Sequence, residues 1–292
     1  MRVTRESLLD LAMRSTTRQY SELVRVQSQA TSGIRFQRAS EAPVDAARAE
    51  RASESADDQD VYIANAETAI DTLNAADGIL ESVQDIIVRA REIAVAMASE
   101  TMDAEARSVA ATEVSTLRTR MQQAANADFD GRYIFAGEAW DTEPFALDGT
   151  YSGSTAEPTT VVGSSTTVRT AFDGSAIFTG STDVFGALSA LETALVANDI
   201  PGVQASLGDL TDATDAISTA RADLAVDTNT AEASMVAAES AGLVAADRLN
   251  DLLATDPIET YARMTELQSG YERTRQVIAS TSTRSLIDLL GS

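Results

Sequence analysis

The side chains that could do chemistry in this chain come from a narrow set. Its 292 residues include 45 Asp and Glu and 22 basic residues, all of them Arg, but no His and no Cys. Without imidazole or thiol groups, catalytic triads, cysteine nucleophiles and ordinary zinc sites are excluded. Glycine-rich phosphate-binding loops are missing, and carboxylates are so numerous that pairs of them arise by chance. The sequence therefore predicts a protein that is not an enzyme and uses no cofactor.

One fragment is similar to a metal site. Asn126, Asp128, Asp130 and Gly131 match positions one, three, five and six of a calcium-binding loop. Position twelve, which should be Glu, is Gly137, and the fragment lies between a predicted helix and a predicted strand. We therefore interpret it as an Asx-rich turn that ends a helix, and we predict no metal.

The charge of the chain restricts its partners. A net charge of −23 argues against nucleic acid and anionic membranes. No run of about eighteen apolar residues could span a membrane, and charges throughout residues 1–30 argue against a cleaved signal peptide. The two ends differ from the rest, because residues 1–35 hold six Arg and three acids and residues 263–292 hold four Arg and three acids. We expect these ends to meet acidic surfaces of neighbouring molecules.

The other predicted helices must pack around one long apolar seam. Apolar residues recur at alternating steps of four and three, which predicts one long helix of roughly 50 Å with a narrow apolar stripe. Such a stripe must be covered by other helices, and we expect residues 103–125 and 201–253 to cover it. The seam consists of Tyr62, Ala66, Ala69, Leu73, Ala76, Leu80, Val83, Ile87, Ala90, Ala94 and Met97.

Helical periodicity covers most of the remaining chain. The stretch between residues 126 and 180 differs, because it is rich in Gly, Ser and Thr and contains short β-prone runs separated by turns. The predicted helices are residues 7–30, 45–99, 103–125, 183–197, 201–253 and 257–290, and the β-prone runs are 132–135, 159–162, 166–170 and 176–179.

These elements predict a mainly α protein. We expect an elongated antiparallel helical bundle or coiled coil made from both chain ends, with a small β-rich insert domain at the far tip. The predicted domains are residues 1–42 with 257–292 as a terminal helical coiled-coil domain, residues 43–126 with 183–256 as a helical rod, and residues 127–182 as the insert.

The two terminal stripes are narrow and contain Thr and Gln. Two such helices alone would be marginal, so we expect them to become ordered when they pack against neighbouring subunits. Apolar stripes at both ends of the chain are typical of a polymerising protein. The predicted subunit interface consists of Leu9, Met13, Tyr20, Leu23, Met264, Leu267, Tyr271, Ile278, Leu286 and Leu289.

Two sequence elements near the start of the long helix carry a resemblance. Thr31-Ser32-Gly33-Ile34-Arg35 is similar to the S-[ST]-G-[LK]-R element of the flagellin-like axial proteins of bacterial flagella. The next element, residues 38–47, resembles the segment that follows it in that family, and Pro43 favours the hook-associated protein 3 (FlgL) type. Glu41-Ala42 departs from the Asp-Asp pair usual there.

A second motif distinguishes within the family. The run from Asn126 to Gly137 is similar to N-x-x-x-x-G-R-Y-[IL]-F-[AG]-G of the hook-associated type, which Pro144-Phe145 follows here as a "PF" element. Flagellins carry Asn-x-Phe-Asn-Gly instead. Residues 285–290 also resemble that family, and the resemblance covers residues 1–145 and 235–292. The matched positions are Gly131, Arg132, Tyr133, Phe135 and Gly137.

This resemblance implies a structural, extracellular junction protein between the hook and the filament of the flagellum. It implies type III export without a cleaved signal peptide. The implied partners are other copies of the chain, the other junction protein (FlgK type), flagellin and an export chaperone, with no nucleic acid and no membrane insertion.

Other interpretations stay open at this point. A flagellin would be a filament subunit of the same class. A monomeric helical-bundle adhesin or binding module would have protease-resistant termini, and a carboxylate enzyme would need a desolvated acid pair.

Overall fold

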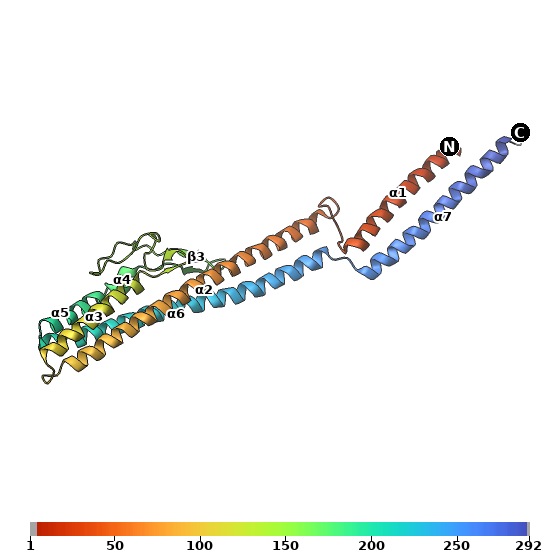
Figure 1. Ribbon diagram of the computed structural model, residues 1–292. Coiled ribbons are helices and arrows are strands. Elements are labelled where there is room, and N and C mark those ends of the chain that lie inside the picture. Colours follow the sequence, from red (N-terminus) through yellow and green to blue (C-terminus); the bar gives the residue numbers. More distant parts are fainter. Residues whose placement is uncertain (1–4, 291–292) are drawn as a thin grey trace. The chain divides into compact units, whose positions relative to one another are not determined.

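The computed structural model describes residues 5–290, and side-chain environments within residues 10–279 (Figure 1). The chain divides into two compact units. The terminal unit comprises residues 1–56 and 243–292, and the central unit comprises residues 57–242. Two long helices, α2 (Pro43–Met97) and α6 (Ile200–Leu253), each contribute residues to both units.

In the central unit, α2 and α6 run antiparallel. Gly242 lies against Gln59, Arg221 bonds to Asp77, and Gln204 bonds to the carbonyl of Ala98. The predicted seam is confirmed, because its residues from Ala66 to Ala94 are all fully buried. The matching stripe on α6 repeats every seven residues, as in a coiled coil. Its buried members are Val203, Leu210, Ile217, Leu224, Ala231 and Ala238.

Two shorter helices complete this bundle. Helices α3 (Ala104–Ala125) and α5 (Val184–Val196) pack against each other, beside α2 and α6 in Figure 1. Asp103 accepts a hydrogen bond from the backbone of Ala106, and Asp183 accepts one from Gly186, so each carboxylate caps its helix. The α2–α3 connection is short, which explains the antiparallel hairpin.

The residues between α3 and α5 form the insert. It contains two antiparallel two-stranded sheets, β1 (Asp128–Phe129) with β2 (Arg132–Tyr133), and β3 (Thr159–Val161) with β4 (Thr167–Arg169). Asp130 and Gly131 form the β1–β2 turn with positive φ angles of 53° and 74°, as a two-residue hairpin loop requires. The interpretation of this fragment as a turn is thus confirmed.

One predicted β-prone run is wrong. Residues 176–179 belong mostly to a short helix, α4 (Gly174–Phe178). Asp173 starts this helix, because its carboxylate accepts hydrogen bonds from the backbone and the hydroxyl of Ser175. The helix directs Phe178 into an aromatic core, where it is fully buried.

The place of the insert within the central unit also differs from the expectation. We expected it at a tip, but Asn65 of α2 donates a hydrogen bond to Val161, and Arg169 pairs with Asp227 of α6. The insert therefore lies beside the two long helices, since the α2–α3 hairpin doubles back and returns the chain along α2. The corners at residues 98–103 and 197–199 form that end of the bundle instead (Figure 1).

In the terminal unit, α1 (Arg5–Ser32) and α7 (Pro257–Leu290) form an antiparallel pair. Gly33 ends α1 with a φ angle of 70°, and Asp256 caps α7 by accepting hydrogen bonds from the backbone of Ile258 and Glu259. These are the predicted helix ends. The mainly helical, antiparallel fold class is confirmed.

Candidate subunit interface

The predicted interface residues of α7 face α1. Met264, Leu267, Tyr271 and Ile278 are half-buried, and the ring centre of Tyr271 lies 5.7 Å from that of Tyr20. These four side chains therefore already pack within their own chain in part. The side chains of Leu9, Leu286 and Leu289 lie outside the part of the chain that the structure describes.

The predicted residues of α1 divide between two faces. Leu23 is half-buried with its neighbour Val26, which is fully buried. Met13 and Tyr20, in contrast, remain 60% and 54% exposed. Met13, Tyr20 and Val24 follow helical spacing along one side of α1, so they form an apolar stripe that stays about half exposed even though Tyr20 meets Tyr271 of α7.

Further apolar side chains of the terminal unit are exposed. Leu11 on α1 and Ile258, Tyr261 and Val277 on α7 are all more than half exposed. Exposed apolar side chains on a two-helix pair are candidates for burial against other chains. We name Leu11, Met13, Tyr20, Val24, Ile258, Tyr261 and Val277 the terminal apolar surface.

A carboxylate lies across the α1–α7 pair. Glu22 accepts a hydrogen bond from Arg25 on its own helix, and Arg263 of α7 approaches it at 3.2 Å. The hydrogen bond from Arg25 lowers the pKa of Glu22, against partial burial, and the charges of both arginines lower it further. Glu22 is therefore favoured as an anion that links the two helices.

The first family motif builds the connection between α1 and α2. The Ser32 hydroxyl accepts a hydrogen bond from the backbone of Ile34, and the backbone of Arg35 donates one to Leu253. The Arg35 side chain pairs with Asp45, and Pro43 is the first residue of α2. This motif thus fixes a turn and presents no free reactive group.

The second family motif builds the insert. Phe135 is fully buried and meets Phe178 edge to face, with ring centres 5.3 Å apart. Asn126, which ends α3, accepts a hydrogen bond from the backbone of Phe145 and donates one to its carbonyl, at 2.8 and 2.7 Å. The motif residue Tyr133 is half-buried in β2 and donates a backbone hydrogen bond to Trp140.

Two other motif residues have specific neighbours. Arg132 stacks over the ring of Trp140, the single Trp of the chain, at 5.1 Å. Gly137 has a φ angle of 59°, and a Cβ there would overlap the carbonyl oxygens of Ser154 and Ala156. Only glycine suits this position, because backbone approaches closely and φ is positive.

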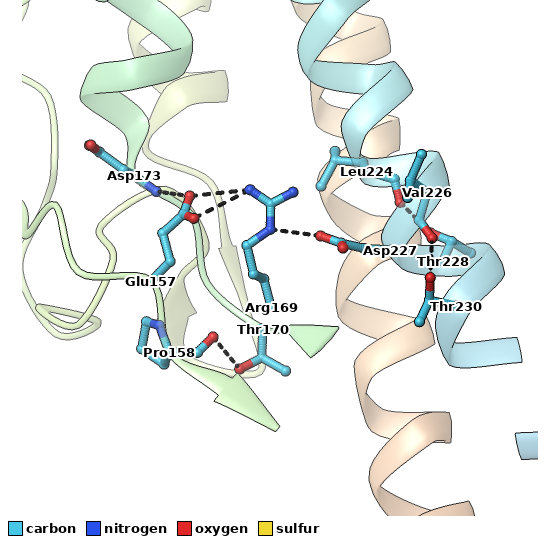
Figure 2. Close-up of polar contacts among 10 residues, drawn as sticks. All are labelled: Glu157, Pro158, Arg169, Thr170, Asp173, Leu224, Val226, Asp227, Thr228 and Thr230. Carbon is cyan, nitrogen blue, oxygen red and sulfur yellow. Dashed lines mark hydrogen bonds and ion pairs between the residues drawn. The ribbon is translucent and has the colours of Figure 1, made fainter. Parts of the chain in front are cut away.

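Sequence reasoning missed several charged residues that hold the central unit together. Figure 2 shows Arg169 between Glu157 of the insert and Asp227 of α6. The Arg169 guanidinium lies 2.7 Å from the Asp227 carboxylate. Arg107 is buried and donates hydrogen bonds to the carbonyls of Met97 and Ser99 and to the side chain of Asn198. Nothing in their spacing along the sequence marks these residues.

Among the described residues, no arrangement of side chains suits catalysis or metal binding. The buried polar side chains there are Arg107, Ser206 and Thr260, so none of them is a carboxylate. No group of three acidic side chains in this part of the chain could hold a metal ion. Between residues 5 and 290, every helix is too short or too polar to cross a lipid bilayer.

The comparisons with known proteins agree with the motifs. Residues 7–139 match the bacterial flagellin N-terminal helical region. The chain is 27% identical over 184 residues to flagellar hook-associated protein 3 of Salmonella typhimurium, covering 62% of this chain and 58% of that protein. It is 28% identical over 155 residues to the same protein of Escherichia coli, covering 52% and 49%. The chain thus spans about half the length of the curated relatives it matches.

Solved structures share the fold. A putative flagellar hook-associated protein from Vibrio parahaemolyticus superposes with a TM-score of 0.66 at 21% identity, over 73% of this chain and all of that one. Bacillus cereus FlgL gives a TM-score of 0.60 at 19% identity, over 70% of this chain and all of that one. The chain thus matches the bacterial flagellin N-terminal helical region over residues 7–139, is similar in sequence to flagellar hook-associated protein 3, and is similar in fold to solved hook-associated proteins.

Proposed function

We propose that this chain is a structural subunit of the bacterial flagellum that connects the hook and the filament outside the cell. The relatives at 27% and 28% identity are flagellar hook-associated proteins, and the motif that sets that type apart from flagellins is present in full. In the described structure, this motif builds the aromatic core and the turns of the insert rather than a reactive site.

The observation that carries the assembly role is the terminal apolar surface. Burying one large apolar side chain contributes roughly 1.5–3 kcal/mol, whereas ordering each backbone residue costs about 1–2 kcal/mol. Several neighbours must therefore cover this surface together before the terminal helices gain stability. The proposed partners are other copies, the other junction protein (FlgK type) and flagellin, with an export chaperone before assembly.

The proposed interface keeps the residues predicted from the sequence. Leu23, Met264, Leu267, Tyr271 and Ile278 stabilise the α1–α7 pair, and the exposed Met13 and Tyr20 are available to other subunits. We propose residues 1–42 with 257–292 as the assembly core, residues 43–126 with 183–256 as the rod, and residues 127–182 as the insert domain.

Complementation tests this role. In cells that lack the native protein, Met13→Asp or Tyr20→Asp should abolish filament attachment and swarming, because a carboxylate would be buried in the subunit interface. Val109→Asp is the matched control, since Val109 is 66% exposed but lies on α3 of the central unit. Swarming and attached filaments at the unchanged level in both α1 variants would contradict the proposal. So would long filaments grown by the purified chain on filament seeds, which a flagellin would form.

A further inference from the structure

The net charge of this chain resides entirely in one unit. Residues 57–242 hold 31 acids and 8 Arg, which gives −23. The remaining residues, which form the terminal unit, hold 14 acids and 14 Arg and are therefore neutral in sum. The terminal apolar surface thus belongs to a unit without net charge, and copies could approach there without net repulsion.

The arginines of the central unit are mostly engaged inside it. Arg89, Arg118, Arg169 and Arg221 form ion pairs with seven acids of the same unit. Arg107 is buried against carbonyl oxygens, and Arg132 stacks on Trp140. Within residues 57–242, all of which the structure describes, 24 acids have no ion pair. Two Arg of this unit, Arg91 and Arg120, are exposed without an ion pair.

A central unit of this kind cannot complement a second copy of itself. Two such surfaces would bring many carboxylates together against very few free cations, and like charges repel over about one Debye length. We propose that the central units of neighbouring copies repel each other, so that self-association through the neutral terminal unit is controlled by ionic strength. This inference rests on the proposed assembly role and adds its regulation.

Self-association of the full chain tests the inference. Sedimentation velocity would be run in NaCl from about 20 mM to about 500 mM, which shortens the Debye length from about 20 Å to about 4 Å. We expect association to strengthen at least tenfold across this range. A central variant replaces Glu67, Asp212, Asp215, Glu232 and Glu239, all exposed and without ion pairs, by the matching amides. Lowering the charge of the unit from 23 to 18 removes roughly 40% of the repulsion, which scales with the square of the charge.

A matched terminal variant tests whether the unit from which the acids are removed matters, or only their number. It replaces Glu50, Glu54, Asp247, Asp251 and Glu266 by the matching amides. These five acids are also exposed and without ion pairs, and they match the central set in number and residue type. We expect the central variant to associate at least threefold more tightly than the unchanged chain at low salt. The terminal variant should associate no more tightly than the unchanged chain, because its terminal unit then carries +5 and like charges meet at the associating surface. Equal shifts in both variants, association that weakens as salt rises, or no association at any salt would overturn the inference. Labelling of the chain at the wrong place on the flagellum would instead overturn the proposed function, whatever the salt dependence.

Discussion

Arg107 is the only charged residue that is buried among the described side chains. Its guanidinium reaches two carbonyls at the end of α2, Met97 at 3.0 Å and Ser99 at 2.7 Å, and the Asn198 side chain at 2.6 Å. Carbonyl groups at a helix end attract cations, because the helix dipole is negative there. Asn198 lies before α6 with a positive φ angle of 54°. Arg107 therefore connects the α2–α3 corner to the α5–α6 corner.

Arg107→Met should destabilise the central unit. A fully buried carbonyl left without a donor costs roughly 1–3 kcal/mol, and these part-buried carbonyls should cost less, which a urea unfolding curve would register as a lower midpoint. Arg120→Met, on the same helix, is the control, because Arg120 is exposed and has no ion pair. Equal midpoints for the two variants would show that Arg107 does not hold the corners.

Two glycines of the second family motif have positive φ angles but different surroundings. Gly131→Ala should cost about 1–2 kcal/mol, from backbone strain alone, since a Cβ there meets nothing within 4 Å. Gly137→Ala adds an overlap with two carbonyl oxygens, and we expect a loss of roughly 3–5 kcal/mol. Thermal or urea unfolding would measure both, and a Gly137 variant no less stable than the Gly131 variant would refute this interpretation of the motif.

At the scale of elements, the regular spacing of apolar residues explains why the long helices are predicted correctly from the sequence. The 3.5-residue spacing from Tyr62 to Met97 admits one buried face, and the structure buries it from Ala66 to Ala94 and half-buries its two ends. The helix ends at Gly33 and Pro257 also follow from local chemistry. The insert is harder to predict, because its strands are two or three residues long. At residues 176–179 the capping carboxylate of Asp173 and the burial of Phe178 outweigh β propensity.

The candidate interface could be predicted in part. The α7 stripe from Met264 to Ile278 faces α1 as its spacing indicates. On α1, the predicted stripe joins Met13 and Tyr20 with Leu23, but Met13 and Tyr20 remain more than half exposed. A weak stripe that contains Thr and Gln does not determine which face meets the partner helix. Which residues contact other subunits therefore stays a prediction.

The α1–α7 pair should depend on pH through Glu22. Because its pKa in the folded protein is lowered by the hydrogen bond from Arg25 and by both arginines, it stabilises the pair above the ordinary pKa of 4.5, and this contribution is lost as pH falls further. Glu22→Gln should therefore speed amide hydrogen exchange in α1 and α7 at neutral pH. The difference should shrink at pH values below 4.5. A difference that persists unchanged in acid would contradict the role of the carboxylate.

At the scale of the whole molecule, the terminal unit, which includes the terminal apolar surface, has no net charge, and the central unit carries all of the net charge. This division suits a subunit that joins an assembly through its terminal helices and exposes its central unit to water. The missing His and Cys, and the motif residues built into turns and cores, agree with a structural role.

The central proposal is that the chain forms the junction between hook and filament. Immunogold labelling of detached flagella, with an antibody raised against this chain, tests it directly. We expect gold particles at a single short zone where the hook meets the filament, and no label on flagella from a strain that lacks the gene. Label distributed along the length of the filament would identify a filament subunit, and flagella without label would contradict the assignment altogether.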